Sequence, residues 1–173
     1  MWRCLSVSDE PQPRLVAVGG LPGAGKSTVA GQIATRLQAR RLRTDELRKE
    51  LFDSPRYTDT ETTAVYRQLC DRATDRLRAD ESVVLDATFA QRQHRRAVHE
   101  ASRDHGAVFR FVLVVCDQSV LESRIVERDG ISDADLSVSR QFRSSYDPVE
   151  IAHETIDNSG ERAETRSQVA ALF

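Results

Sequence analysis

A glycine-rich segment near the amino terminus carries the clearest chemical signal. Gly20–Ser27 is GLPGAGKS, which matches the pattern G-x-x-x-x-G-K-[ST]. Glycines in such a loop turn backbone N–H groups around a phosphate, and the following helix adds the partial positive charge of its N-terminus. We predict that this loop binds ATP with Mg²⁺. The expected binding residues are Gly20, Leu21, Pro22, Gly23, Ala24, Gly25, Lys26, Ser27 and Thr28. Lys26 is expected on the β and γ phosphates, and the Ser27 hydroxyl on Mg²⁺.

Asp86 is the second candidate metal ligand. It ends the apolar run VVLD, where a carboxylate at the carboxyl edge of a strand would meet Mg²⁺ or its water. The next residue is Ala87, which lacks the second carboxylate that orients water in fast ATPases, so the pattern favours phosphoryl transfer to another acceptor. The alternative is that Asp86 is a turn or capping residue, a role that Thr88 would serve equally well.

Asp45 and Arg48 lie three residues apart in the segment TDELRKE. On a helix they share one turn and one face. Asp45 could then orient an acceptor hydroxyl or take its proton, while Arg48 holds the acceptor or a phosphate. An N-terminal helix cap with a surface ion pair explains the same residues equally well.

Two groups of arginines are further candidates. Arg124 and Arg128 are four residues apart and could neutralise charge on the triphosphate, although pairing with Glu122 and Glu127 is the competing interpretation. The cluster Arg92, Arg95 and Arg96 could meet an anionic substrate, or it could form a solvated helix face.

Composition narrows the class of protein. The chain has 173 residues, of which 39% are hydrophobic and 30% charged, and its net charge is −2. We expect one soluble domain, without a membrane span, an export signal or an evident DNA-binding surface. The cysteines Cys4, Cys70 and Cys116 form no CxxC pair, and the four histidines have no ligand spacing, so we expect a reduced, cytoplasmic protein without a histidine metal site.

Hydrophobic patterns predict strands that alternate with helices. The expected strands cover residues 14–20, 41–44, 82–89, 109–117 and 153–160, and the expected helices begin at or near residues 27, 45, 58, 91, 119 and 161. This alternation predicts a parallel sheet with helices on both faces.

Four motifs occur in a distinctive order: GGLPGAGKST, LRTDELRKEL, SVVLDATFAQRQHRRA and VCDQSVLESRIVER. With them the sequence resembles the small P-loop kinases of the polynucleotide kinase and zeta-toxin-like group. It resembles more closely the related ATP-binding domain of AAA type, over Leu15 to Gly160. The resemblance implies an α/β fold, a three-layer α/β/α P-loop NTPase of nucleoside-kinase type. Its five-stranded parallel sheet would have the order 2-3-1-4-5, within a single domain of residues 1–173.

The resemblance also implies roles for particular residues. Asp45 matches the catalytic base and Arg48 the arginine on the acceptor side. Arg124 and Arg128 match the arginines of a mobile lid, expected at about residues 129–147, and Asn158, Ser159 and Gly160 would line the adenine. Residues 1–13 are expected to form a flexible N-terminal segment.

These features predict a kinase that transfers the γ-phosphoryl group of ATP to a hydroxyl of a small molecule or of a nucleic acid 5′ end. The alternative is an ATP-binding switch with slow hydrolysis and a protein partner. An oligomeric AAA+ motor is a third hypothesis, but it would need a glutamate at position 87 and a further helical domain.

Overall fold

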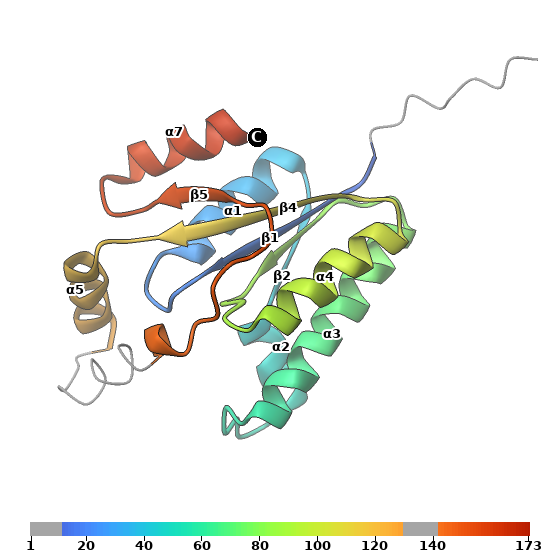
Figure 1. Cartoon of the computed structure of the whole chain (residues 1–173), viewed down its shortest axis with the longest axis horizontal. Coiled ribbons are helices and arrows are strands. Elements are labelled where there is room, and N and C mark those ends of the chain that lie inside the picture. The colour runs from blue at the N-terminus through green and yellow to red at the C-terminus, as the bar shows by residue number, and fades with distance from the viewer. Residues whose placement is uncertain (1–11, 130–141) are drawn as a thin grey trace, which may run out of the picture.

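The computed structural model describes residues 12–129 and 142–173. Its centre is a sheet of five strands, all parallel, in the order β2-β3-β1-β4-β5 (Figure 1). The strands are β1 (Arg14–Gly20), β2 (Arg40–Arg43), β3 (Val83–Asp86), β4 (Val108–Val115) and β5 (Glu154–Asp157). The sheet order and the α/β class expected from the sequence are confirmed.

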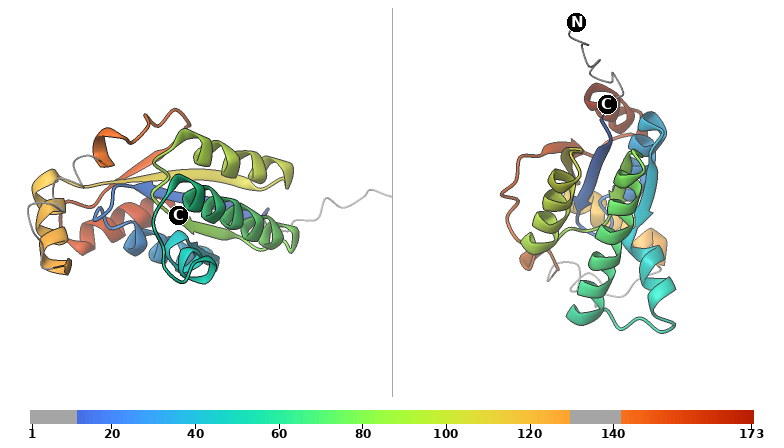
Figure 2. Two further views of the ribbon diagram at one scale, coloured as in Figure 1. Left: turned by 90° about the horizontal axis from the view of Figure 1, so that it is seen from below. Right: turned by 90° about the vertical axis from the view of Figure 1, so that its right-hand side faces the viewer.

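Helices cover both faces of this sheet (Figures 1 and 2). They are α1 (Lys26–Leu37), α2 (Thr44–Leu51), α3 (Asp59–Arg78), α4 (Arg92–Asp104), α5 (Gln118–Asp129) and α7 (Arg162–Leu172). Because side chains alternate along a strand, β1 sends Val16 and Val18 to one face and Leu15 and Ala17 to the other. The first pair packs with residues of α1 and α7, and the second with residues of α2, α3 and α4.

Some strands end earlier than the sequence predicts, because the chain enters a loop there. β3 was expected to reach Phe89, but it ends at Asp86. Beyond that residue the Gly20 N–H donates to the Thr88 carbonyl, and Phe89 takes a positive φ of 50°. These contacts turn the chain out of the ladder, so the apolar run VVLDATF is half strand and half loop.

Two expected segments lie mostly outside the described residues: the N-terminal segment 1–13 and the lid at about 129–147. Within the described ranges, no helix combines the length and the apolar character that a membrane crossing would require.

Candidate functional site

The glycine loop forms at the carboxyl end of β1, as its sequence predicts. Gly20 has φ 141° and Gly25 has φ 91°, which glycine adopts without the penalty that a Cβ imposes. A Cβ on Gly20 would overlap the Val114 carbonyl of β4, and one on Gly25 would overlap the side-chain amide of Asn158. We call residues 20–28 the P-loop. Its glycines are required both by conformation and by neighbouring atoms.

The N-terminus of α1 is suited to an anion. In this fully described helix, the cap residue Gly25 makes no side-chain cap, and the first turn contains no acidic residue. The first N–H groups of a helix lack intrahelical acceptors and carry partial positive charge, so they favour phosphate. Lys26 adds a full charge, and its Nζ donates to the Leu21 carbonyl across the loop at 2.9 Å. The amine therefore lies over the P-loop.

Asn158, which was expected beside the adenine, braces the P-loop. Its Nδ2 donates to the Ala24 carbonyl at 2.8 Å, and its Oδ1 accepts from the Thr165 hydroxyl of α7 at 2.8 Å. The residue is buried, and its backbone N–H donates to Val115 at the end of β4. Both polar groups of this side chain are thus engaged with the protein, and the loop after β5 holds the P-loop in place.

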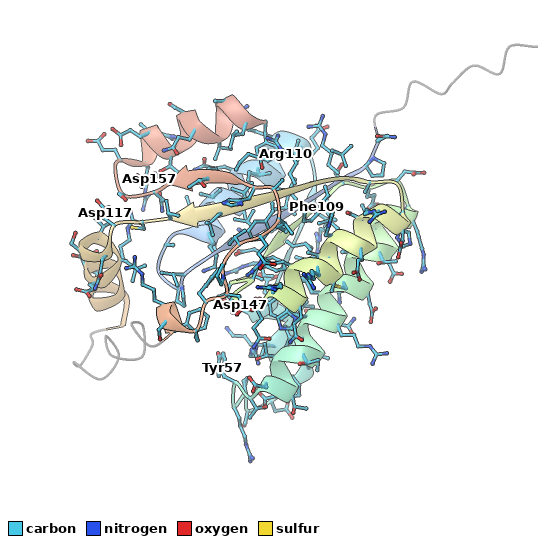
Figure 3. The ribbon with its side chains drawn as sticks, in the orientation of Figure 1. Tyr57, Phe109, Arg110, Asp117, Asp147 and Asp157 are labelled. Atoms are coloured by element: carbon cyan, nitrogen blue, oxygen red, sulfur yellow. The ribbon has the colours of Figure 1, made fainter. Side chains whose placement is uncertain are left out.

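The neighbouring residues Ser159 and Gly160 complete the same loop. The Asp117 N–H donates to Ser159 Oγ at 2.8 Å, and Ser159 Oγ donates to Asp157 Oδ1 at 2.6 Å. The hydroxyl and the backbone N–H of Ser159 both donate to this carboxylate and lower the pKa of the exposed Asp157 carboxyl. Figure 3 shows Asp117 and Asp157 at the same end of adjacent strands, where Asp157 ends β5 and Asp117 follows β4. The loop is therefore fixed at the edge of the sheet where the P-loop lies.

Asp86 ends β3 with a carboxylate that is only 5% exposed. In the parallel register it is opposite Arg43, the last residue of β2, and Arg43 Nε donates to Asp86 Oδ2 at 3.3 Å. Arg43 also donates from Nη1 to Glu46 Oε1 at 3.1 Å. Asp86 was predicted from the sequence, whereas Arg43, whose positive charge pairs with it, was not.

Asp45 and Arg48 both belong to α2, but their surroundings differ. Asp45, in the first turn, is exposed, whereas Arg48 is buried at 7% exposure. The Arg48 guanidinium donates to the Thr62 hydroxyl at 3.3 Å, pairs with Glu61 at 3.6 Å and lies 4.6 Å from the centre of the Tyr57 ring. The carboxylate is thus accessible to a substrate, while the guanidinium is packed between α2 and α3.

Of the two predicted arginines of α5, the structure places the side chain of Arg124 only. Arg124 lies beside the P-loop: its Nη1 is 3.5 Å from Cys116 Sγ and 3.9 Å from the Cβ position of Gly25. The side chain of Arg128 lies outside the described residues. The structure therefore brings Arg124 to the phosphate side of the site.

The arginines of the cluster on α4 differ in burial. Arg95 is 1% exposed, so neither a substrate contact at the surface nor a solvated helix face describes it. Its guanidinium donates to four backbone carbonyls, those of Phe89, Ala90, Asp147 and Pro148. Arg92 and Arg96 are more exposed, and both form ion pairs with Glu150. Arg95 is therefore a structural residue that joins the β3–α4 loop to residues 147 and 148.

The residues at this edge that could hold a metal ion fit Mg²⁺. Ser27 supplies a hydroxyl and Asp86 a carboxylate, and hard oxygen ligands are those that Mg²⁺ prefers. The described part of the chain contains no group of three or more His, Cys, Asp and Glu side chains placed to hold a metal. Mg²⁺ is usually held by one or two protein oxygens together with phosphates and water, which agrees with this small ligand set.

Comparison with known proteins decides the family. Residues 15–149 match the family model described as AAA domain. The chain belongs to the AAA domain family. Curated relatives include Uncharacterized protein Rv2004c of Mycobacterium tuberculosis and Uncharacterized protein Mb2027c of Mycobacterium bovis. Each is 31% identical over 174 residues, covering 92% of this chain and 34% of the relative. The AAA domain chain thus spans about a third of the length of these relatives.

Solved structures share the fold of this AAA domain. A putative kinase from Chloroflexus aurantiacus has a TM-score of 0.75 at 19% identity, covering 94% of this chain and 97% of that one. The Mycobacterium tuberculosis APS kinase CysC, in complex with AMPPNP and APS, has a TM-score of 0.74 at 21% identity, covering 94% and 98%. A gluconokinase from Sinorhizobium meliloti has a TM-score of 0.71 at 22% identity, covering 93% and 94%. The fold is that of the small P-loop kinases.

A group of hydrogen bonds around Thr88 of the AAA domain was also not predicted from the sequence. The Thr88 carbonyl accepts from the Gly20 N–H of the P-loop and from the Tyr146 hydroxyl at 2.8 Å. The Tyr66 hydroxyl of α3 contacts Thr88 Oγ1 at 3.2 Å and accepts from the Phe89 N–H at 2.9 Å. Burial raises the pKa of Tyr146 to about 12, so its phenol remains a donor at neutral pH. The motif SVVLDATF predicted a strand that reaches Phe89, and it did not reveal these two distant tyrosines.

Proposed function

We propose that the chain is an ATP-dependent phosphotransferase that moves the γ-phosphoryl group of ATP to a hydroxyl of a small molecule. The observation that carries the proposal is the row of groups at one edge of the sheet. The P-loop follows β1, Asp86 ends β3, and Asp45 begins the helix after β2, and these three strands are neighbours in the order β2-β3-β1. Strands are about 4.8 Å apart, so roughly 10 Å separates the ends of β1 and β2.

That separation leaves room for the donor phosphate at the P-loop and the acceptor hydroxyl at Asp45 to face each other in line. The P-loop amides and Lys26 hold the triphosphate, and Arg124 approaches from the side of α5. Ser27 and Asp86 would hold Mg²⁺, which supplies charge neutralisation at the transferred phosphoryl group. Residues 158–160 would border the adenine while Asn158 braces the P-loop, and Arg128 would join the triphosphate from the lid.

Asp45 is the proposed base on the acceptor side. Its exposed carboxylate can orient the acceptor hydroxyl and take its proton during transfer. Arg48 is proposed to position this side of the site, because its contacts with Glu61, Thr62 and Tyr57 fix α2 against α3. Hydrolysis would need a carboxylate that activates water at position 87, next to Asp86. Residue 87 is instead an alanine that is 2% exposed. This arrangement favours transfer over hydrolysis.

The names of the structural relatives support the same class. Gluconokinase and APS kinase are kinases, and the APS kinase structure holds both AMPPNP and APS. Their identities to this chain are low, so they support a kinase with a small acceptor and leave the acceptor itself to experiment. A nucleic acid 5′ end remains in the screen for that reason.

The test is transfer of labelled γ-phosphate in the presence of Mg²⁺ to sugars, amino sugars, nucleosides and DNA or RNA 5′ ends. With the acceptor found, Asp45→Asn should lower kcat by about 10²-fold or more, as expected for loss of a general base. The dissociation constant for ATP should change less than about twofold, because Asp45 is two strands from the P-loop.

Asp53→Asn is the matched control, because it removes another exposed carboxylate just beyond α2. It should leave both constants unchanged. Full transfer by Asp45→Asn would exclude this residue as the base. Rapid phosphate release that no acceptor alters would refute the kinase and indicate an ATPase.

A further inference from the structure

Arg43 bridges two carboxylates at the site without any assigned part in the chemistry. It ends β2 and directly precedes α2. Its Nε lies 3.3 Å from Asp86 Oδ2, and its Nη1 lies 3.1 Å from Glu46 Oε1 in the first turn of α2. One guanidinium thus connects the strand-end carboxylate with the acceptor side of the site.

The two carboxylates differ in their access to water. The Asp86 side chain is 5% exposed, whereas that of Glu46 is 56% exposed. A buried carboxylate needs a nearby positive charge, because desolvation of an unpaired ion is costly. Burial by itself would lower the pKa of Arg43, but the hydrogen bond to Glu46 and the charge of Asp86 raise it, so Arg43 stays a cation.

Asp86 is also the proposed Mg²⁺ ligand, so Arg43 and Mg²⁺ would compete for its carboxylate. Arg43 Nε occupies a lone pair of Oδ2, and a metal ion or its bound water needs lone pairs of this group. Mg²⁺ bound with a triphosphate brings a higher charge density than a delocalised guanidinium. Arg43 can give up Asp86 and keep its bond to Glu46, because the two carboxylates meet different nitrogens of one side chain.

We propose that Arg43 is a positioning residue that competes with Mg²⁺ for Asp86 and moves toward Glu46 when the metal–nucleotide complex binds. The inference rests on the proposed Mg²⁺ and ATP site, although it does not require an acceptor. Its consequence is that Arg43 sets the Mg²⁺ concentration at which the nucleotide binds. It also carries positive charge toward Asp45, the neighbour of Glu46, at the moment the donor is in place.

The test measures binding of a fluorescent ATP analogue over a Mg²⁺ titration, without any acceptor. Arg43→Gln should lower the half-saturating Mg²⁺ concentration by about fivefold, because the competing charge-assisted hydrogen bond is gone. Arg40→Gln is the matched control: it removes the same charge from an exposed position of β2 and should cause no shift. Arg43→Lys keeps the charge and should restore a half-saturation near that of the unaltered chain.

A double-variant comparison makes the dependence on Asp86 explicit. In an Asp86→Asn background, Arg43→Gln should no longer shift the Mg²⁺ titration, since the contested carboxylate is absent. Thermal melting without nucleotide reports whether each variant is folded. If Arg43→Gln is not folded, Arg43→Met replaces it in both backgrounds: the half-saturating Mg²⁺ concentration should fall where Asp86 is present and stay unchanged in the Asp86→Asn background.

An unchanged or higher Mg²⁺ requirement in folded Arg43→Gln would overturn the inference, because it would mean that Arg43 does not compete or that it aids the metal. Binding of the analogue without any Mg²⁺ dependence would overturn it as well. Failure of the proposed function is a separate result: the expected Mg²⁺ shift without phosphate transfer to any acceptor would support competition at Asp86 and refute the kinase.

Discussion

The side-chain amide of Asn158 donates to the carbonyl of Ala24 at 2.8 Å, so the loop after the last strand is joined to the P-loop. Thr165 fixes the other end of the same amide. Ala24 and Asn158 are both buried, and water is therefore a poor substitute for either partner. The shape of the P-loop thus depends on a residue from the opposite end of the chain.

Asn158→Ala should weaken nucleotide binding through the P-loop itself. We expect the dissociation constant for ATP to rise about tenfold and the free energy of unfolding to fall by about 1–3 kcal/mol, since buried partners lose their hydrogen bonds. Binding of ATP and of inorganic tripolyphosphate, measured by calorimetry, separates two roles. Bracing predicts that both affinities fall, whereas a contact with adenine alone predicts that only ATP is affected.

Thr165→Val is the control for that variant. It removes the hydroxyl that donates to Asn158 but leaves the bond to Ala24 available. Stability should fall by about 1 kcal/mol, with triphosphate affinity nearly unchanged.

Gly25→Ala should be far more damaging than the same change at another glycine with positive φ. Gly25 and Gly106 have φ values of 91° and 62°, and each would strain an alanine by about 1 kcal/mol. Only at Gly25 does the new Cβ overlap the Asn158 amide, because no atom lies within 4 Å of the Cβ position of Gly106. Chemical denaturation should show a total loss of about 2–4 kcal/mol for Gly25→Ala.

The cost of the overlap between the new Cβ at position 25 and the Asn158 amide can be measured separately by removing that amide. In an Asn158→Ala background, Gly25→Ala should lose only the backbone strain, so the two changes should be non-additive. Equal losses in both backgrounds would show that the amide is not the obstacle. Gly106→Ala should cost the same in either background.

Arg95→Met should destabilise the fold more than any change at the exposed arginines of α4. Methionine retains much of the buried volume but leaves the four carbonyls without their donor. We expect a loss of about 3–5 kcal/mol in the free energy of unfolding, because several buried carbonyls lose charge-assisted hydrogen bonds at once. Arg92→Met loses an ion pair at a side chain that is 43% exposed, so its loss should stay below about 1 kcal/mol. Similar urea midpoints for the two variants would contradict this assignment.

The arginine cluster at the start of α4 shows where sequence patterns stop being informative. Arg92, Arg95 and Arg96 lie within five consecutive residues and are chemically identical, so any local pattern treats them as one cationic group. Arg95 is buried because residues 147 and 148 fold back over it, more than fifty positions later in the chain. Local periodicity has no access to that contact.

The P-loop and the strand order were within reach of the sequence for different reasons. The glycine spacing between an apolar strand and an amphipathic helix is a local signal, and it predicted the loop correctly. The order of the strands came from a family resemblance. Arg43 was missed because its partnership with Asp86 appears only when β2 and β3 are placed side by side in register.

The bond between Asn158 and Ala24 joins residues 134 positions apart, and this has a consequence for biosynthesis. Translation delivers the phosphate-binding motif well before its brace. A ribosome-bound nascent chain that ends before residue 158 would contain every residue of the motif and still lack the bond that holds its shape. Capture of the first nucleotide should therefore follow the synthesis of residue 158.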